Sequence, residues 1–147
     1  MEECPKFNTY LLEAMKLQKL AVRVLNETLA PMQLSALQAV YMIYLHSNNQ
    51  GLTLKELTDY TYVDKAQITR VSADLISRGL IVTDKSEGKE RRYRVFLTEA
   101  GRLKAGEILS EMPAVENEIL EKLDAGSRQN LCEAMQYLTE ILSSHEK

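Results

Sequence analysis

Two helix-start signatures, eleven residues apart, constrain the fold of this chain more than any other feature. In the first, Thr53 is followed three residues later by Glu56, and in the second Asp64 is followed by Gln67. A cap residue of this kind accepts a hydrogen bond from the backbone N–H three residues on, and the Glu or Gln there reaches back to the cap. The sequence therefore predicts that two short helices begin at these positions.

The short joint between these helices limits how they can pack. Two helices so close in sequence cannot lie side by side as a long hairpin, so we expect them to cross as a helix-turn-helix. A crossed pair of this kind can place its second helix in the major groove of DNA.

The composition is that of an ordinary single-domain protein. The chain has 147 residues, of which 45% are hydrophobic and 27% charged, which is enough for one continuous core. No apolar run approaches the roughly 20 residues of a membrane span, and residues 1–5 lack the apolar stretch of a secretory signal. We therefore expect a cytoplasmic protein without a membrane partner.

The net charge of the whole chain is −3, which by itself argues against a nucleic-acid partner, but the charge is unevenly distributed along the chain. Residues 52–104 carry 11 Lys and Arg against 8 Asp and Glu, so the middle of the chain is basic and its ends are acidic. Binding depends on the local field at the phosphates more than on the total charge, so this distribution is compatible with DNA binding.

Hydrophobic spacing predicts long helices at both ends of the chain. Apolar residues recur every three or four positions over residues 5–29, and Pro31 suits the first turn of a second helix that ends near the loop at 47–51. Thr98 is a good cap for a final helical region, which is expected to break at 112–113 and again at 124–127.

The region between these helices predicts a small hairpin. Ile68, Val71 and Leu75 form the buried stripe of the second capped helix, and Gly79 ends it. Residues 81–83 and 92–97 then alternate like two short strands around a basic turn. The predicted fold class is mainly α with a small β-hairpin wing, in a single domain over 1–147: a winged helix-turn-helix at 31–98, flanked by dimerisation helices at 5–30 and 99–146.

The terminal helices also predict the oligomeric state. Helices of that length would expose much apolar surface on a lone chain, and packing against a second copy removes that surface from water. We predict a two-fold homodimer.

Three motifs together resemble the MarR family of bacterial winged helix-turn-helix regulators. Residues 63–70 (VDKAQITR) resemble the opening of the family's recognition helix, residues 75–81 (LISRGLI) its end, and residues 97–101 (LTEAG) the motif that closes the wing. The motifs are specific in combination, whereas each alone is weak. The resemblance implies a dimer that binds double-stranded DNA, with recognition helices in successive major grooves and wings in the flanking minor grooves.

The resemblance places the wing arginine at Arg91. The family usually carries an aspartate two residues earlier, and this chain has Lys89 there. The departure removes the acidic partner that would orient Arg91, while Lys89 adds positive charge for phosphates.

The predicted DNA-binding residues are those off the buried stripe of the second helix together with the cations of the wing. Glutamine can pair with adenine, arginine with guanine, and a threonine or alanine methyl can touch thymine, while arginine also favours a narrow minor groove. The simpler alternatives are that the helix residues form only a solvated face, with Gln67 serving only as a capping partner, and that the wing cations belong only to a solvent-exposed turn. The candidates are Lys65, Ala66, Gln67, Thr69, Arg70, Lys89, Arg91 and Arg92, with Lys85 and Arg94 as further members of the wing cluster.

Aromatic and methionine residues suggest a pocket for an effector. Tyr10, Met15, Tyr41 and Tyr44 could hold a small aromatic or amphipathic molecule beneath the dimer helices, as the resemblance implies. Apolar residues at helical spacing are more often simply core.

The leading functional hypothesis is a dimeric repressor that occupies an inverted-repeat operator and is released by an effector. A winged-helix interaction module without DNA binding shares every packing signal, and only the basic wing tip speaks against it. A thiol redox sensor would need an activated Cys4 or Cys132, and only Lys6 adds positive charge near Cys4 in the sequence. His46 and His145 are the only histidines, and no catalytic motif is present, so we predict no metal, no cofactor and no enzyme.

Overall fold

The computed structural model describes residues 6–84 and 93–145 of the chain. These residues fall into two compact units, Met1–Leu109 and Ser110–Lys147. Among the helices of the described ranges, none is both long enough and apolar enough to cross a membrane.

The first unit begins with three helical segments. They are α1 (Phe7–Leu29), a 3-10 turn at Ala30–Met32 and α2 (Ala36–Ser47). Pro31 lies in the 3-10 turn, so the prediction that it opens the second helix was wrong. The start of α2 is fixed by Ser35 instead, whose side chain forms a capping box with Gln38. The Ser-x-x-Gln signal for this box is present in the sequence, and our sequence reading missed it.

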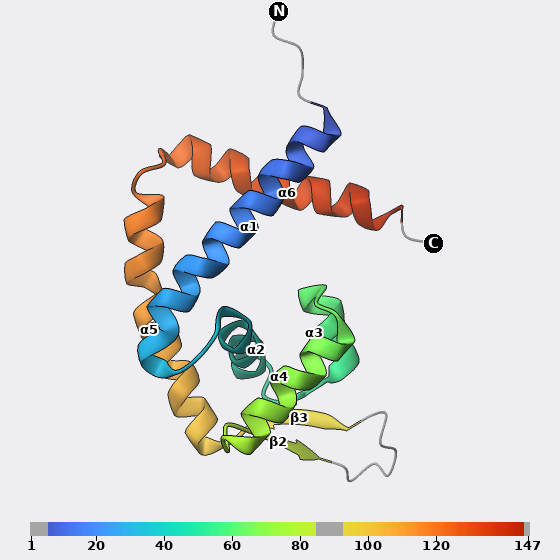
Figure 1. The fold of residues 1–147 in the computed structure, drawn as a ribbon, viewed down its shortest axis with the longest axis vertical. Coiled ribbons are helices and arrows are strands. Elements are labelled where there is room, and N and C mark those ends of the chain that lie inside the picture. Colours follow the sequence, from blue (N-terminus) through green and yellow to red (C-terminus); the bar gives the residue numbers. More distant parts are fainter. Residues whose placement is uncertain (1–5, 85–92, 146–147) are drawn as a thin grey trace, which may run out of the picture. The chain divides into compact units, whose positions relative to one another are not determined.

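The helix-turn-helix consists of α3 (Leu54–Thr61) and α4 (Lys65–Ser77), which follow one another as two short crossed helices beside α2 (Figure 1). The predicted stop of α4 is confirmed. Gly79 has a left-handed backbone with φ of 71°, and the N–H of Leu80 donates to the Leu75 carbonyl oxygen at 3.0 Å.

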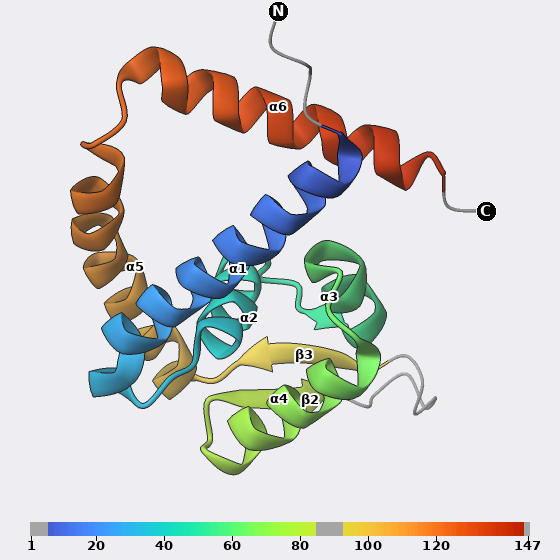
Figure 2. The same ribbon diagram turned by 45° about the horizontal axis from the view of Figure 1, so that its top comes forward.

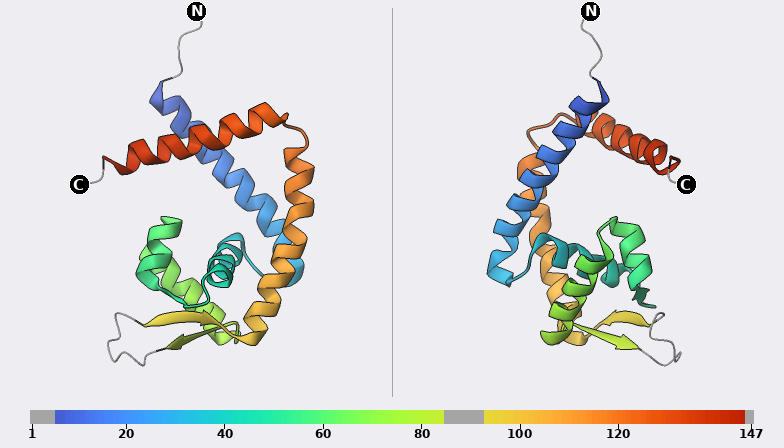
Figure 3. Two further views of the ribbon diagram at one scale, coloured as in Figure 1. Left: turned by 180° about the vertical axis from the view of Figure 1, so that it is seen from behind. Right: turned by 45° about the vertical axis from the view of Figure 1, so that its right-hand side comes forward.

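A three-stranded antiparallel sheet completes the predicted winged helix fold. Strands β2 (Ile81–Asp84) and β3 (Arg94–Leu97) pair with Ile81 opposite Leu97, and β1 (Leu52–Thr53) adds to the other edge of β3. Strand β2 continues from the end of α4, and β3 leads into α5 (Glu99–Leu120), as Figure 2 shows. Both views of Figure 3 show β2 and β3 side by side. The sequence pattern did not predict β1, because the strand has only two residues and one of them, Thr53, is the cap of α3.

The core of the first unit lies between α2, α3, α4 and the inner face of the sheet. Its fully buried side chains come from all four of these parts and from α1 and α5; the largest are Leu29, Tyr41, Met42, Leu57, Ile68, Leu75, Val95 and Ile108. Alternation along β3 is as predicted, since Val95 and Leu97 are buried while Arg94 and Phe96 are partly exposed.

Two predictions about the final helices have different outcomes. The expected break at 112–113 was wrong, because α5 continues through Pro113 to Leu120. A proline removes one backbone donor, and the hydrogen bonds on either side can carry the helix past it. The second break is confirmed, since α6 (Ala125–Ser143) begins anew with Asp124 as its cap. The Ser127 N–H and hydroxyl both donate to the Asp124 carboxylate, which lowers the pKa of that group.

Candidate nucleic-acid interface

The two predicted helix starts are built differently. At α3 the capping box is confirmed: Thr53 Oγ1 accepts from the Glu56 N–H at 3.1 Å, and Glu56 Oε2 accepts from the Thr53 N–H at 2.9 Å. At α4 the predicted helix start is confirmed, since Asp64 is the N-cap, but the predicted capping box was wrong, because Asp64 Oδ1 accepts from the N–H of Ala66, two residues on, at 3.0 Å. The side chain of Gln67 therefore takes no part in the cap, so the alternative that it serves only as a capping partner was wrong.

The turn between the helices uses a residue with a left-handed backbone. Tyr62 has φ of 54°, and its N–H donates to the Thr58 carbonyl oxygen at 2.8 Å, which ends α3. The Thr61 hydroxyl accepts from the N–H of Val63 at 3.2 Å. Only three residues then separate α3 from α4, so the helices must cross.

Helix α4 separates an anchored side from an exposed one. The buried residues of α4 are Ile68, Ser72 and Leu75. Ile68 and Leu75 belong to the predicted buried stripe, whereas its third member, Val71, is half-buried. The five predicted DNA-binding residues of this helix are all exposed on its N-terminal half: Lys65, Ala66, Gln67, Thr69 and Arg70.

A buried hydrogen bond joins the anchored side of α4 to α2. The Tyr41 hydroxyl lies 2.7 Å from Ser72 Oγ, and Ser72 in turn donates to the Ile68 carbonyl oxygen at 2.8 Å. Tyr41 therefore acts as the donor in the first bond. Burial raises the pKa of the Tyr41 hydroxyl to about 12.

A cavity of about 740 Å³ opens between α3 and α4. Two predicted DNA-binding residues, Lys65 and Thr69, line it together with Leu54, Lys55, Thr58, Asp59 and Tyr93. The Lys55 ammonium pairs with the Asp59 carboxylate at 3.2 Å, whereas Lys65 forms no ion pair with any of the described residues. The Lys65 ammonium is a donor of the kind that binds phosphate oxygens, whereas the Thr58 and Thr69 hydroxyls donate to backbone carbonyls of their own helices.

The inner end of the wing is held by contacts that our sequence reading did not predict. Arg94 Nη1 donates to the Gly51 carbonyl oxygen at 3.1 Å and lies 3.6 Å from Glu56 Oε2. Gly51 is required at its position, because its φ is 76° and a Cβ would lie 2.8 Å from the Phe96 ring. Arg94 thus links β3 to the capping box of α3. The remaining wing candidates, Lys85, Lys89, Arg91 and Arg92, lie outside the described residues.

Comparison with protein families identifies the family to which a chain with this helix-turn-helix and wing belongs. The sequence matches the model of the winged helix DNA-binding domain over residues 17–101, more than half of the chain. The chain belongs to this family. A search of curated proteins found no match for this winged helix chain.

Solved structures confirm the MarR fold. A putative MarR family transcriptional regulator from Listeria monocytogenes, complexed with a 26mer DNA, is 19% identical with a TM-score of 0.80 over 98% of this chain and 91% of its own. A mutant of MarR from E. coli, complexed with operator DNA, is 23% identical with a TM-score of 0.78 over 90% and 94%. MepR from S. aureus, in a DNA complex, is 18% identical with a TM-score of 0.75 over 95% and 99%.

The four predicted effector residues of the winged helix chain do not share one environment. Tyr41 belongs to the core rather than to an open pocket, because its ring is fully buried and its hydroxyl is bonded to Ser72. Tyr44 is half-buried and stacks on the ring of Tyr60 at a centroid distance of 5.5 Å. Tyr10 and Met15 are exposed on α1.

The cysteines and possible metal ligands add little to the site. Cys132 is a free, exposed thiol on α6, and Cys4 lies outside the described residues. Within residues 6–84 and 93–145, no three His, Cys, Asp or Glu side chains gather closely enough to hold a metal ion.

Proposed function

We propose that this chain is a DNA-binding transcription regulator that reads base edges with the exposed half of α4. The observation that carries the proposal is the separation of faces on this helix: the buried side is fixed to α2, while Lys65, Gln67 and Arg70 stand free in solvent. A glutamine and an arginine at the N-terminal end of such a helix suit adenine and guanine in the major groove.

The DNA complexes of the similar structures support the same use of the fold. Three proteins with this architecture were solved in complex with DNA. The wing residues Lys89, Arg91 and Arg92 would add phosphate or minor-groove contacts beside α4.

We further propose that the protein acts as a homodimer on an inverted repeat, as a repressor released by a small aromatic or amphipathic effector. Support for the dimer comes from apolar side chains that each unit exposes by itself. In the first unit, α1 exposes Phe7, Tyr10, Leu11 and Met15, and in the second, α6 has no buried residue and exposes Leu131, Met135, Leu138 and Leu142. Burial of such surface against a second copy is favourable.

The experiment is selection of duplexes from a random-sequence library by the full-length chain, followed by binding measurements at several salt concentrations. We expect enrichment of an inverted repeat with half-sites about one helical turn apart. Arg70→Ala should weaken binding and relax the base preference at one position of each half-site by about 1–3 kcal/mol. Arg23→Ala on α1, which removes the same charge, should leave that preference intact.

A charge reversal provides the contrary test. If Lys65→Glu together with Arg70→Glu left duplex binding unchanged, α4 would not be the reading surface. A dimeric protein-interaction module would then explain the fold better.

A further inference from the structure

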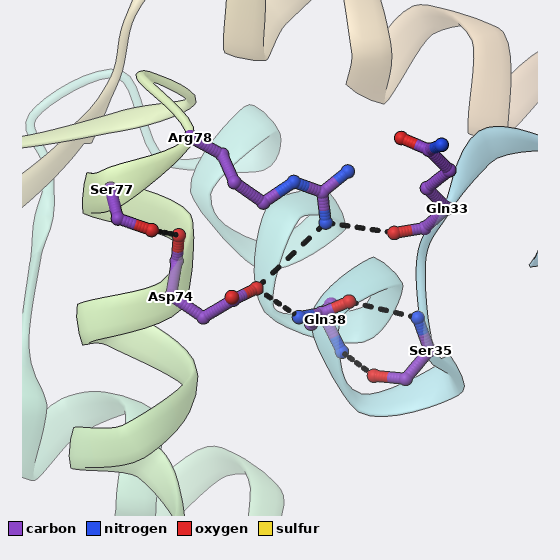
Figure 4. Close-up of polar contacts among 6 residues, drawn as sticks. All are labelled: Gln33, Ser35, Gln38, Asp74, Ser77 and Arg78. Carbon is purple, nitrogen blue, oxygen red and sulfur yellow. Dashed lines mark hydrogen bonds and ion pairs between the residues drawn. The ribbon is translucent and has the colours of Figure 1, made fainter.

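The C-terminal half of α4 is tied by side chains to the start of α2. Arg78 Nη1 donates to the Gln33 carbonyl oxygen at 2.8 Å, and Gln38 Nε2 donates to Asp74 Oδ2 at 2.5 Å. The same Arg78 nitrogen lies 3.8 Å from Asp74 Oδ2, so the ion pair closes the network (Figure 4). We call these four residues the α4 clamp.

The partners on the α2 side of the clamp are themselves fixed. Gln38 Oε1 accepts from the Ser35 N–H at 2.9 Å, and the Ser35 hydroxyl accepts from the Gln38 N–H at 3.2 Å. This box sets the orientation of the amide, so that its Nε2 is directed at Asp74 (Figure 4). Gln33 has a left-handed backbone with φ of 59°, and its N–H donates to the Ala30 carbonyl oxygen. The clamp therefore fastens α4 to a well-defined piece of backbone.

Asp74 is an unfavourable residue for DNA binding on charge alone. It lies one helical turn beyond Arg70, and its side chain is 49% exposed, so its negative charge opposes the approach of phosphates. Within the described structure its carboxylate serves the contacts to Gln38 and Arg78.

We propose that Gln38, Asp74 and Arg78 are positioning residues that hold α4 at the angle its exposed half needs to read the major groove, without touching DNA themselves. The proposal rests on the proposed function of α4. It adds that geometry imposed from the α1–α2 connection, and not only the side chains at the interface, determines specific affinity. A small rotation of a recognition element is sufficient to misalign base contacts, because hydrogen bonds weaken steeply with distance and angle.

Two substitutions of Asp74 separate positioning from charge. Asp74→Asn and Asp74→Ala each remove one negative charge, but only asparagine keeps an oxygen that can accept from Gln38 Nε2. We expect the asparagine variant to bind the duplex enriched by the wild-type chain at least as tightly as the wild type. The alanine variant should bind it about three- to tenfold more weakly than the asparagine variant, the range of one net hydrogen bond.

Arg78 offers an independent readout. Arg78→Ala should weaken binding to the enriched duplex by a similar factor, with partial recovery in Arg78→Lys, which can still donate to the Gln33 carbonyl. If Arg78 only positions α4, the slope of log affinity against log salt stays unchanged, whereas loss of a phosphate contact lowers it by about one. A scrambled duplex of equal length and composition should bind Asp74→Asn and Asp74→Ala alike, because these two variants carry the same charge. Thermal unfolding of each variant checks that the comparison is made between folded proteins.

The outcomes are distinguishable from those that test the proposed function. Equal affinity of Asp74→Ala and Asp74→Asn for the enriched duplex would overturn the clamp proposal while the DNA-binding proposal stands. Failure of the wild-type chain to enrich any duplex would remove the proposed function and the role of the clamp together.

Discussion

The hydroxyl of Tyr41 and that of Ser72 lie 2.7 Å apart in the core and join α2 to α4. Both residues are buried, and no buried side-chain nitrogen or oxygen of the described residues lacks a hydrogen-bond partner. The bond therefore satisfies two polar groups that would otherwise destabilise the folded state.

Tyr41→Phe should lower the free energy of unfolding by about 1 kcal/mol near neutral pH, because it removes one buried hydrogen bond and keeps the ring. The difference should shrink as pH rises from 10 toward 12. In that window the unfolded tyrosine loses its proton while the folded one, with its pKa raised to about 12, retains it, so the wild type loses stability. Urea unfolding of both proteins across this range checks the trend. A constant difference at all pH values would contradict the raised pKa.

Gly101 and Gly106 on α5 form a matched pair for substitution by alanine. A Cβ at Gly101 would collide with the Leu80 carbonyl oxygen, whereas a Cβ at Gly106 would meet no atom within 4 Å. We expect Gly101→Ala to destabilise by about 1–3 kcal/mol through overpacking, and Gly106→Ala to stabilise by about 0.5–1 kcal/mol as a helix-interior replacement. Shifts of the urea midpoint at constant slope measure both. Effects of the same sign would show that the close approach of α5 to Leu80 is absent.

Glu56 combines a cap with an ion pair, and two substitutions separate them. Glu56→Gln keeps the capping-box acceptor but loses the charge opposite Arg94, so we expect a loss of only a few tenths of a kcal/mol, as for other exposed pairs. Glu56→Ala loses both, and the loss should approach about 1 kcal/mol. Chemical unfolding provides the measurement. If the glutamine variant were as unstable as the alanine one, the ion pair rather than the cap would dominate.

The apolar stripe of α6 predicts which single change dissociates the proposed dimer. Leu131, Met135, Leu138 and Leu142 recur at intervals of four and three residues and are exposed in the single chain. Leu138→Glu should convert the dimer to monomers and reduce affinity for an inverted repeat, because a charge would have to be buried in the interface. Gln136→Glu adds the same charge away from the stripe and should leave the dimer intact. Sedimentation velocity distinguishes these results; a Leu138→Glu protein that remains dimeric would place the interface elsewhere.

Sequence patterns predicted the elements whose causes are local. The Thr53–Glu56 box, the Gly79 stop and the alternation along β3 each depend on residues within a few positions of one another, and all three are confirmed. Two helix caps were predicted incorrectly although they are local. The capping box at Ser35 was overlooked. At Asp64 the expected box is replaced by a hydrogen bond from the N–H two residues on, because several cap geometries fit a similar pattern.

Contacts between distant residues could not be predicted from the sequence. Gln38 and Asp74 are 36 residues apart, Gln33 and Arg78 are 45 apart, and Gly51 and Arg94 are 43 apart. No spacing rule connects such pairs, since their proximity follows only from the packing of α2, α4 and the sheet. The wing candidates illustrate the same limit: Arg94 was grouped with the DNA-contacting cations, yet its guanidinium bonds to Gly51 and pairs with Glu56.

The separation of α4 into a buried side and an exposed side has a consequence for how the sequence of this helix can change. Of its five outward candidates, only Thr69 has a side-chain hydrogen bond within the described structure, and that bond goes to the Lys65 carbonyl of the same helix. Ile68, Ser72 and Leu75 anchor the helix without contributing to the outward surface. If α4 reads DNA as proposed, exchanging a few of its solvent-facing side chains would change the target preference while the buried side of the helix stays the same.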